Sequence, residues 1–349
     1  MSFDIKQVPP LFLPYSTLQP AERMFEKYFK QNPILPIFPN IDACDSIFKR
    51  SAMNLAGIEV ANGKIKKFDY ENKDVKKSFI VLDKAFETGN INELQNFCFE
   101  SSYFRIFLDF IEKNKSKIAY INLVGPFTFA LLLCKMKNFE LFENKVFRKF
   151  IVQSISVKAM WAIKKIKEVS LETTPVIILD EPLLKNLGEL KNKVEEINLE
   201  LIVALTSTIV EKIHAENAKV MYQSFEKCDW KIPVDSGVDI ISFNADNYLD
   251  NLVIFKDKIK EFLQKGGQLN WAVVSGITEA SIKGYSVDYL VKKMNFAFSQ
   301  LIDAGISPKL VYNSATISIN GDLSRLPIVI AEKAIILTSQ VVQKIPRVN

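Results

Sequence analysis

The sequence is poor in histidine, which limits the catalytic and metal chemistry open to it. Its 349 residues include a single histidine, His214. A catalytic zinc needs three ligands from Cys, His, Asp or Glu, and a Ser-His-Asp or Cys-His arrangement needs an imidazole beside its nucleophile. His214 falls on the flank of a predicted outer helix, TSTIVEKIHAENA. We therefore expect a surface histidine, no metal site and no cofactor.

The few cysteines show no pairing pattern. They are Cys44, Cys98, Cys134 and Cys228, with no CxxC and no close pair. Cys228 follows a predicted strand but has no visible partner. The first ten residues, MSFDIKQVPP, lack the basic-then-apolar pattern of a signal peptide. Together these observations predict reduced thiols in a cytoplasmic protein.

Arginine and glycine-rich motifs are also scarce. Only six of the 45 basic residues are arginines. Nucleic-acid readers favour arginine for its bidentate fork. The scattered lysines and the net charge of +5 predict a solvated surface and no nucleic-acid partner. No GxGxxG or GxxxxGK[ST] follows any predicted strand, which excludes those nucleotide sites.

Long apolar runs are absent as well. The longest uncharged stretch considered, residues 118–134, is slightly short for a membrane span and contains Asn122 and a Gly125-Pro126 break. A buried strand, a turn and a helix explain it better. We expect no membrane partner.

Short apolar runs bounded by turn signals predict eight strands. They cover residues 11–16, 34–39, 118–124, 174–180, 219–224, 238–243, 268–274 and 309–315. Most are apolar throughout, as parallel strands buried on both faces are. Segments of helical period lie between them, including 20–30, 140–168, 250–264, 286–304 and 324–343. Eight alternations favour a closed (β/α)8 barrel, with a doubly wound open sheet as the alternative.

The region at about 41–115 departs from this alternation. It contains a sequence typical of a hairpin turn, Ala61-Asn62-Gly63, and several helical segments. We interpret it as an α+β insertion after the second strand. The chain as a whole, residues 1–349, is then one barrel domain carrying that insertion.

Polar residues at the ends of the predicted strands are the candidate site, because a barrel places its site at the carboxyl ends of its strands. The substrate-binding candidates of this kind are Asn40, Thr128, Gln223, Asn244 and Asn313. Asn122, Gly125, Ser224 and Ser275 occupy similar positions. Small polar residues also cap strand ends for purely structural reasons, so each position has that alternative.

Asp180-Glu181-Pro182 is the strongest of these signals. Two carboxylates directly after the apolar run VIIL would lie at the rim of a pocket, where one could bind an ammonium group or act as a base. Adjacent strand residues point to opposite sides, so we expect at most one to enter the pocket. The alternative is a helix N-cap with a first-turn acid before Pro182.

Several segments together resemble a known family. They are PILPIFP (33–39), LAGIEVANGKI (55–65), LVGPFTFALLL (123–133), KAMWAIKKIK (158–167), IILDEPLL (177–184), CDW (228–230), the stretch 236–274 and LVYNSATISINGDLSRL (310–326). In order and spacing they are similar to the methionine synthase II group, relatives of the catalytic domain of cobalamin-independent methionine synthase. That superfamily includes uroporphyrinogen decarboxylase. The resemblance implies a (β/α)8 barrel and adds Trp271 to the substrate-binding candidates.

The sequence departs from this family at the metal ligands. The family's His-x-Cys motif falls on Gln223 and Phe225, its last cysteine ligand on Asn320, an acidic position on Asn244 and an N-terminal histidine near Thr17. Zinc activates a substrate thiol as thiolate. Amides and a phenyl ring cannot hold the metal for that step. Asp180, Glu181, Gly125 and Thr128 are retained.

The sequence leaves three candidate functions. The first is a metal-free enzyme of this superfamily, methyltransferase-like or decarboxylase-like, that binds or transforms a small polar molecule. It would use Asp180 or Glu181 as anchor or base. The second is a non-catalytic binding protein or scaffold, and the third a zinc-dependent methyltransferase. The arginine-rich motif of uroporphyrinogen decarboxylase is not evident, since only Lys49-Arg50 lies near. The sequence predicts a small-molecule ligand and indicates no oligomeric state.

Overall fold

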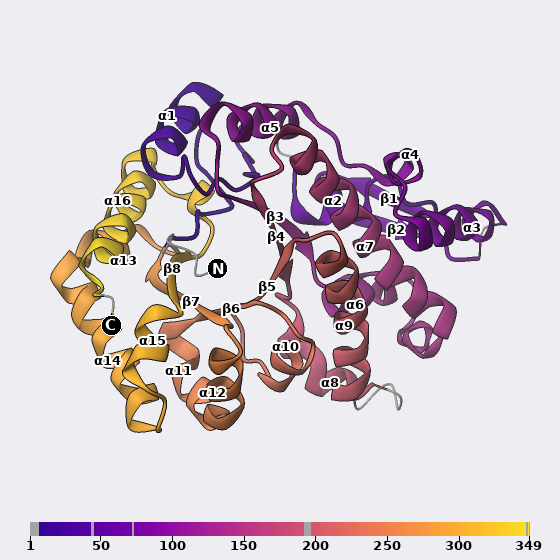
Figure 1. Ribbon diagram of the computed structural model, residues 1–349. Coiled ribbons are helices and arrows are strands. Elements are labelled where there is room, and N and C mark those ends of the chain that lie inside the picture. Colours follow the sequence, from indigo (N-terminus) through magenta and orange to yellow (C-terminus); the bar gives the residue numbers. More distant parts are fainter. Residues whose placement is uncertain (1–6, 43–44, 72, 192–196, 347, 349) are drawn as a thin grey trace.

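The computed structural model describes residues 7–42, 45–71, 73–191, 197–346 and 348; Cys44 lies outside them. Its main feature is a parallel sheet of six strands in sequence order (Figure 1). They are β3 (Ile118–Val124), β4 (Thr174–Asp180), β5 (Lys219–Ser224), β6 (Ile240–Asn244), β7 (Gln268–Ser275) and β8 (Ala315–Asn320). Five of the predicted strands therefore form, with small shifts of their ends.

The prediction of a closed eight-stranded barrel is wrong. Among the described residues the parallel sheet has six strands and curves as a half-barrel. The predicted strands at 11–16 and 34–39 form no ladder. In these segments and just before the first of them, the described residues form only single bridges, which join Gln7 to Ile317, Phe12 to Ile37 and Ile34 to Tyr120.

Proline explains the missing ladders. These two segments and their flanks contain Pro9, Pro10, Pro14, Pro33, Pro36 and Pro39. A proline has no N–H to donate, so a proline-rich segment cannot pair continuously within a sheet. The segments still lie between β8 and β3. Val8 donates to the carbonyl of Ile317 at 2.9 Å, and Leu35 donates to that of Tyr120 at 2.9 Å.

The predicted strand at 309–315 is also wrong. These residues form the helix α15 (Pro308–Asn313), and β8 follows it. The Ser307 side chain caps the helix by accepting from the backbone N–H of Leu310, and Pro308 occupies its first turn. Both are strong signals for a helix start. The true strand, ATISIN, alternates polar and apolar residues and so escapes a search for apolar runs.

Helices cover the outer face of the sheet. Those in direct contact with strands include α7 on β3, α9 on β5, α11 on β6, α14 on β7 and α16 on β8 (Figure 1). The helices besides α15 are α1 (Leu18–Tyr28), α2 (Ile47–Ala52), α3 (Lys73–Thr88), α4 (Ile91–Leu94), α5 (Ser102–Asn114), α6 (Pro126–Met136), α7 (Lys145–Val169), α8 (Leu187–Lys191), α9 (Leu199–Ala215), α10 (Lys231–Asp235), α11 (Ala245–Ile254), α12 (Lys256–Gln264), α13 (Glu279–Gly284), α14 (Val287–Asp303) and α16 (Ile328–Lys344). Within the described part of the chain, no helix is long and apolar enough to cross a membrane.

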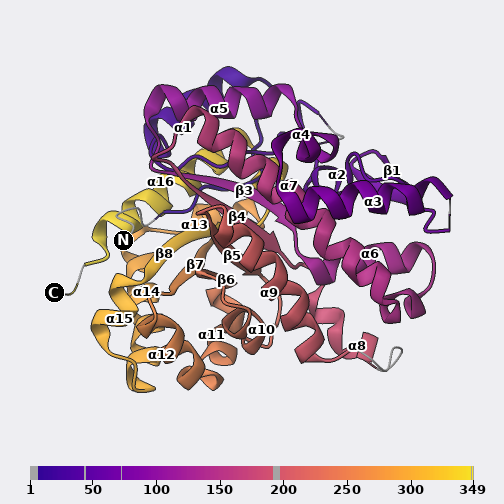
Figure 2. The ribbon, with the colours of Figure 1, turned by 45° about the vertical axis from the view of Figure 1, so that its right-hand side comes forward.

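The region between the second proline-rich segment and β3 contains a hairpin. Strands β1 (Ile58–Ala61) and β2 (Lys64–Phe68) pair antiparallel. Asn62 and Gly63 connect them with positive φ angles of 51° and 67°. Two consecutive positive φ angles are what a tight Asn-Gly hairpin turn requires. The predicted hairpin is therefore confirmed, and Figure 2 shows it beside α3 at one end of the molecule.

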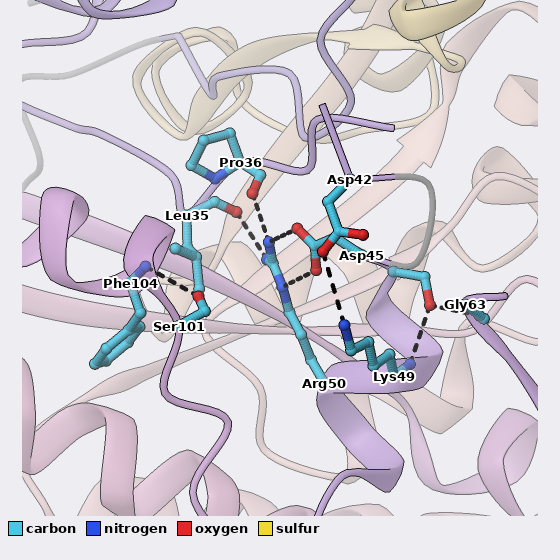
Figure 3. A network of polar contacts seen from close by, with 10 residues as sticks. Leu35, Pro36, Asp42, Asp45, Lys49, Arg50, Gly63, Ser101 and Phe104 are labelled. Carbon is cyan, nitrogen blue, oxygen red and sulfur yellow. Dashed lines mark hydrogen bonds and ion pairs between the residues drawn. The ribbon is translucent and has the colours of Figure 1, made fainter. Parts of the chain in front are cut away.

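Arg50 in α2 fixes the second proline-rich segment (Figure 3). Its guanidinium donates to the backbone carbonyls of Leu35 and Pro36 and forms an ion pair with Asp45 at 2.9 Å. The side chain of Arg50 is almost fully buried. A planar fork with five donors can satisfy carbonyls that no neighbouring strand reaches. Arg50 thus replaces part of the missing ladder.

We expect Arg50→Lys to lower the free energy of unfolding by about 2 kcal/mol, because an ammonium cannot reach both carbonyls and Asp45 at once. Denaturant unfolding followed by circular dichroism measures the change. Arg105→Lys is the matched control, because Arg105 pairs with Glu100 on the surface and should lose at most about 0.5 kcal/mol. Equal losses in both variants would rule out this role for Arg50.

Candidate functional site

A cavity of about 230 Å³ lies at the carboxyl edge of the sheet. This is the edge where open α/β sheets bind ligands. The volume far exceeds the roughly 10–15 Å³ that one water needs. Residues 8–12 line one side of the cavity, and the sheet supplies the other. The remaining lining residues are Ile34, Asn122, Ile178, Asp180, Pro182, Gln223, Phe225, Glu226, Ser318, Ile319 and Gly321.

Asp180 is the central charge of this cavity. It is the last residue of β4 and lies beside Gln223, the matching residue of β5. The Nε2 of Gln223 donates to its Oδ1 at 3.2 Å. Burial raises the pKa of Asp180 to about 6, and the hydrogen bond from Gln223 partly opposes that rise. None of the described residues that line the cavity is a lysine, arginine or histidine.

Two further polar residues, Asn122 and Glu226, line the cavity. Asn122 of β3 is 1% exposed, and its Oδ1 has no hydrogen-bond partner among the described residues. That oxygen is enclosed by the protein, so its missing hydrogen bond costs free energy and offers no contact to a ligand in the cavity. Glu226 adds a second carboxylate at the rim, paired with Lys185 at 2.8 Å. The cavity therefore favours a ligand that donates hydrogen bonds and carries positive charge.

Glu181, the other predicted catalytic residue, does not line the cavity. Its side chain is fully buried and accepts from the backbone N–H groups of Phe127 (2.9 Å) and Thr128 (2.7 Å) at the start of α6. Burial raises its pKa to about 7, hydrogen bonds from Thr128 and Phe127 lower it, and the nearby charge of Asp180 raises it. Glu181 thus ties the end of β4 to α6.

Gly125 and Thr128 belong to the same structural contact. A Cβ atom on Gly125 would lie 2.3 Å from Oε1 of Glu181, closer than real atoms approach. The hydroxyl of Thr128 accepts from the backbone N–H of Leu183 at 3.2 Å. These residues therefore hold two loops of the carboxyl edge together, and Thr128 does not line the cavity.

The other predicted substrate-binding residues lie elsewhere. Asn244 caps α11 by accepting from the N–H of Asp246 at 3.0 Å, and Asn40 donates to the carbonyl of Pro14 at 2.8 Å. Trp271 is buried, with its ring 5.1 Å from that of Phe298.

Asn313 is exposed and ends α15, at the amino end of β8, because residues 309–315 are mostly helical. It bonds to the carbonyl of Val348. Of the predicted catalytic and substrate-binding residues, the cavity brings together Asp180 and Gln223, and Asn122, another polar residue predicted near a strand end, joins them.

A set of polar residues inside the sheet was not predicted from the sequence: Ser242, Asn270, Thr316 and Ser318. All are at most 5% exposed and hydrogen-bonded to one another. Ser242 also donates to Oε1 of Gln223 at 3.4 Å. A signal existed, because polar residues interrupt otherwise apolar strands at these positions. The period-two alternation of β8 would have found two of them.

The residues at the expected zinc positions do not fit a metal. Gln223 and Phe225 line the cavity, whereas Asn244 is a helix cap. Their amides and phenyl ring offer neither thiolate nor imidazole. The described residues contain no group of three or more His, Cys, Asp or Glu side chains arranged to hold a metal ion.

The imidazole of His214 and the thiol of Cys228 lie away from the cavity. His214 is exposed, at the end of α9, and contacts Asp239 at 2.8 Å; that hydrogen bond raises the pKa of His214. Cys228 is buried, and burial raises the pKa of its thiol well above the usual value. Neither side chain contributes to the cavity.

No protein-family model matches this chain, and no curated protein matches it. The case for a function therefore depends on the residues themselves.

Proposed function

We propose that this chain binds a small molecule bearing a protonated amine in the cavity at the carboxyl edge of the sheet. The chain would be a divergent relative of the methionine synthase II group, without its zinc and with a six-stranded open sheet in place of a closed barrel. The observation that carries the proposal is Asp180, a carboxylate at the cavity wall with one neutral donor, Gln223, and no cationic side chain among the described lining residues. An ammonium group would supply the missing charge.

The surroundings of Asp180 support the same class of ligand. The charge of Glu226 at the rim is matched by Lys185, so the net negative charge of the cavity comes from Asp180. Apolar side chains such as Ile34 and Ile178 complete the wall. A few polar groups in a largely apolar cleft are typical of a small-molecule site.

A second candidate function is proton transfer to or from such a ligand. It is favoured by the position of Asp180 at the cavity wall beside a single neutral donor, Gln223, where burial raises the pKa of Asp180 to about 6. A base is most effective when its pKa is close to the working pH. Asp180 would then take a proton from the bound molecule, while Gln223 orients the carboxylate. A non-catalytic binding protein needs only the first function.

Ethanolamine is a suitable probe, and glycolate is its anionic counterpart of similar size. We expect ethanolamine at ten times its Kd to stabilise the fold by about 1.4 kcal/mol, raising the Tm by about 2 °C, and glycolate to have no effect. Asp180→Asn should abolish the shift, because it removes the charge and keeps the shape. Differential scanning calorimetry measures both.

Asn313→Ala is the matched control, since this exposed amide lies far from the cavity at the other end of β8. It should retain the full shift. An absent shift with ethanolamine, an equal shift with glycolate, or an unchanged shift in Asp180→Asn would each refute the proposal.

A further inference from the structure

The inner face of the sheet carries a connected set of polar side chains below the cavity. Asn270 lies at its centre, 0% exposed, between Ser242 on β6 and both Thr316 and Ser318 on β8. Burying polar groups is costly unless they bond to one another. An apolar set would serve the core equally well. These buried polar residues connect to the cavity through Gln223 and Ser318.

These hydrogen bonds run in one direction. Thr316 donates to Oδ1 of Asn270 at 3.1 Å. Nδ2 of Asn270 donates to the hydroxyls of Ser242 and Ser318, both at 2.9 Å.

The chain continues to the cavity. Ser242 donates to Oε1 of Gln223, whose Nε2 donates to Asp180. An ionised carboxylate can only accept, so Asp180 fixes the orientation of the Gln223 amide. With Nε2 directed at Asp180, the Oε1 of Gln223 requires a donor on its other side, and the hydroxyl of Ser242 is that donor.

A second branch ends at the cavity wall. Ser318 lines the cavity and accepts from Asn270. Its own proton has no acceptor among the hydrogen bonds of the described residues, so it is available to a ligand. The cavity thus has an accepting group, Asp180, and a donating group, Ser318.

We propose that Asn270 sets this polarity as a positioning residue, and that the ligand carries an oxygen acceptor for Ser318 in addition to its ammonium group. Asn270 and Ser242 do not line the cavity; they act through Gln223 and Ser318. The ligand class is therefore an amine with a nearby hydroxyl, ether or carbonyl oxygen. This part rests on the proposed function, whereas the positioning of Gln223 does not.

The positioning role is tested without any ligand. Carboxyl ¹³C NMR of aspartate-labelled protein follows the titration of Asp180, identified by the signal lost in Asp180→Asn. Gln223→Ala should raise the pKa of Asp180 by about 0.5 to 1, because a donor to the carboxylate is lost. Asn270→Ala should raise it in the same direction by a smaller amount. The double variant should match Gln223→Ala alone.

Ser242→Ala provides a second variant should Asn270→Ala fail to fold, because it removes only one hydroxyl. It should also raise the pKa of Asp180, whereas Asn313→Ala should leave it unchanged. A merely structural role for the buried amide predicts altered melting with an unchanged pKa of Asp180. That result, or additive shifts in the double variant, would overturn the positioning role.

The ligand class is tested by comparing ethanolamine with ethylammonium, which lacks the hydroxyl. Wild-type protein should bind ethanolamine several-fold more tightly by calorimetry. Ser318→Ala and Asn270→Ala should reduce that preference towards one. Equal binding of both amines by wild type would overturn the oxygen-acceptor inference and leave the proposed function standing. Binding of neither amine would refute the proposed function, while the NMR result would still decide the positioning role.

Discussion

Glu181→Ala should lower the free energy of unfolding by about 3 kcal/mol. The substitution leaves the backbone N–H groups of Phe127 and Thr128 without an acceptor in a fully buried position. Some of the loss is offset, because burial has raised the pKa of Glu181 to about 7 and its charge is costly at neutral pH. Urea unfolding measures the net change. Glu226→Ala, which removes a carboxylate from the exposed pair with Lys185, should cost less than about 1 kcal/mol.

A double-mutant cycle with Gly125 identifies the cause. Gly125→Ala alone should also destabilise the fold strongly, because its Cβ would lie 2.3 Å from the Glu181 carboxylate. In the Glu181→Ala background the obstructing carboxylate is gone, so the same substitution should cost much less. Contacting residues give non-additive changes of this kind. Strict additivity would show that the two residues do not share the contact described.

Lys158→Met should change the pH dependence of stability more than any other substitution considered. Lys158 is fully buried in α7, and its ammonium donates to the carbonyls of Met53 and Phe97. Burial lowers the pKa of Lys158 from 10.5 to about 7. Between these pH values the unfolded chain binds a proton that the folded chain releases. The stability of the wild type should therefore rise with pH in this window.

Relative to Lys158→Met, the wild type should gain roughly 3 kcal/mol between pH 7 and pH 10. Below pH 7 Lys158 is charged in the folded wild type, and burying that charge costs free energy. The stability of Lys158→Met relative to the wild type should therefore be highest there. Guanidinium unfolding at several pH values measures the difference. Lys164→Met is the control on the same helix, because Lys164 is partly exposed and paired with Glu216. A pH-independent difference for Lys158→Met would contradict the lowered pKa.

The candidate site was only partly predictable. The alternation of a strand indicates that Asp180 and Glu181 face opposite ways. Which of them enters a cavity depends on what packs on each side. The N-terminus of α6 lies beside Glu181, and residues 8–12 lie over Asp180. These partners are distant in sequence, so no local pattern identifies them. The same holds for Asn270, whose neighbours come from β6 and β8.

The sequence by itself determined the local elements. Continuous apolar runs placed β3, β4 and β5 at their observed bounds, because burial on both faces selects such residues. Asn62-Gly63 specified the hairpin through its backbone preference. Only the tertiary structure decided that the two proline-rich segments lie between β8 and β3 and pair there through single bridges. Such pairing depends on which N–H groups face a neighbouring strand, and proline has no N–H to donate. The tertiary structure also decided which carboxylate serves the cavity, since a side chain's role is set by the groups that folding brings beside it.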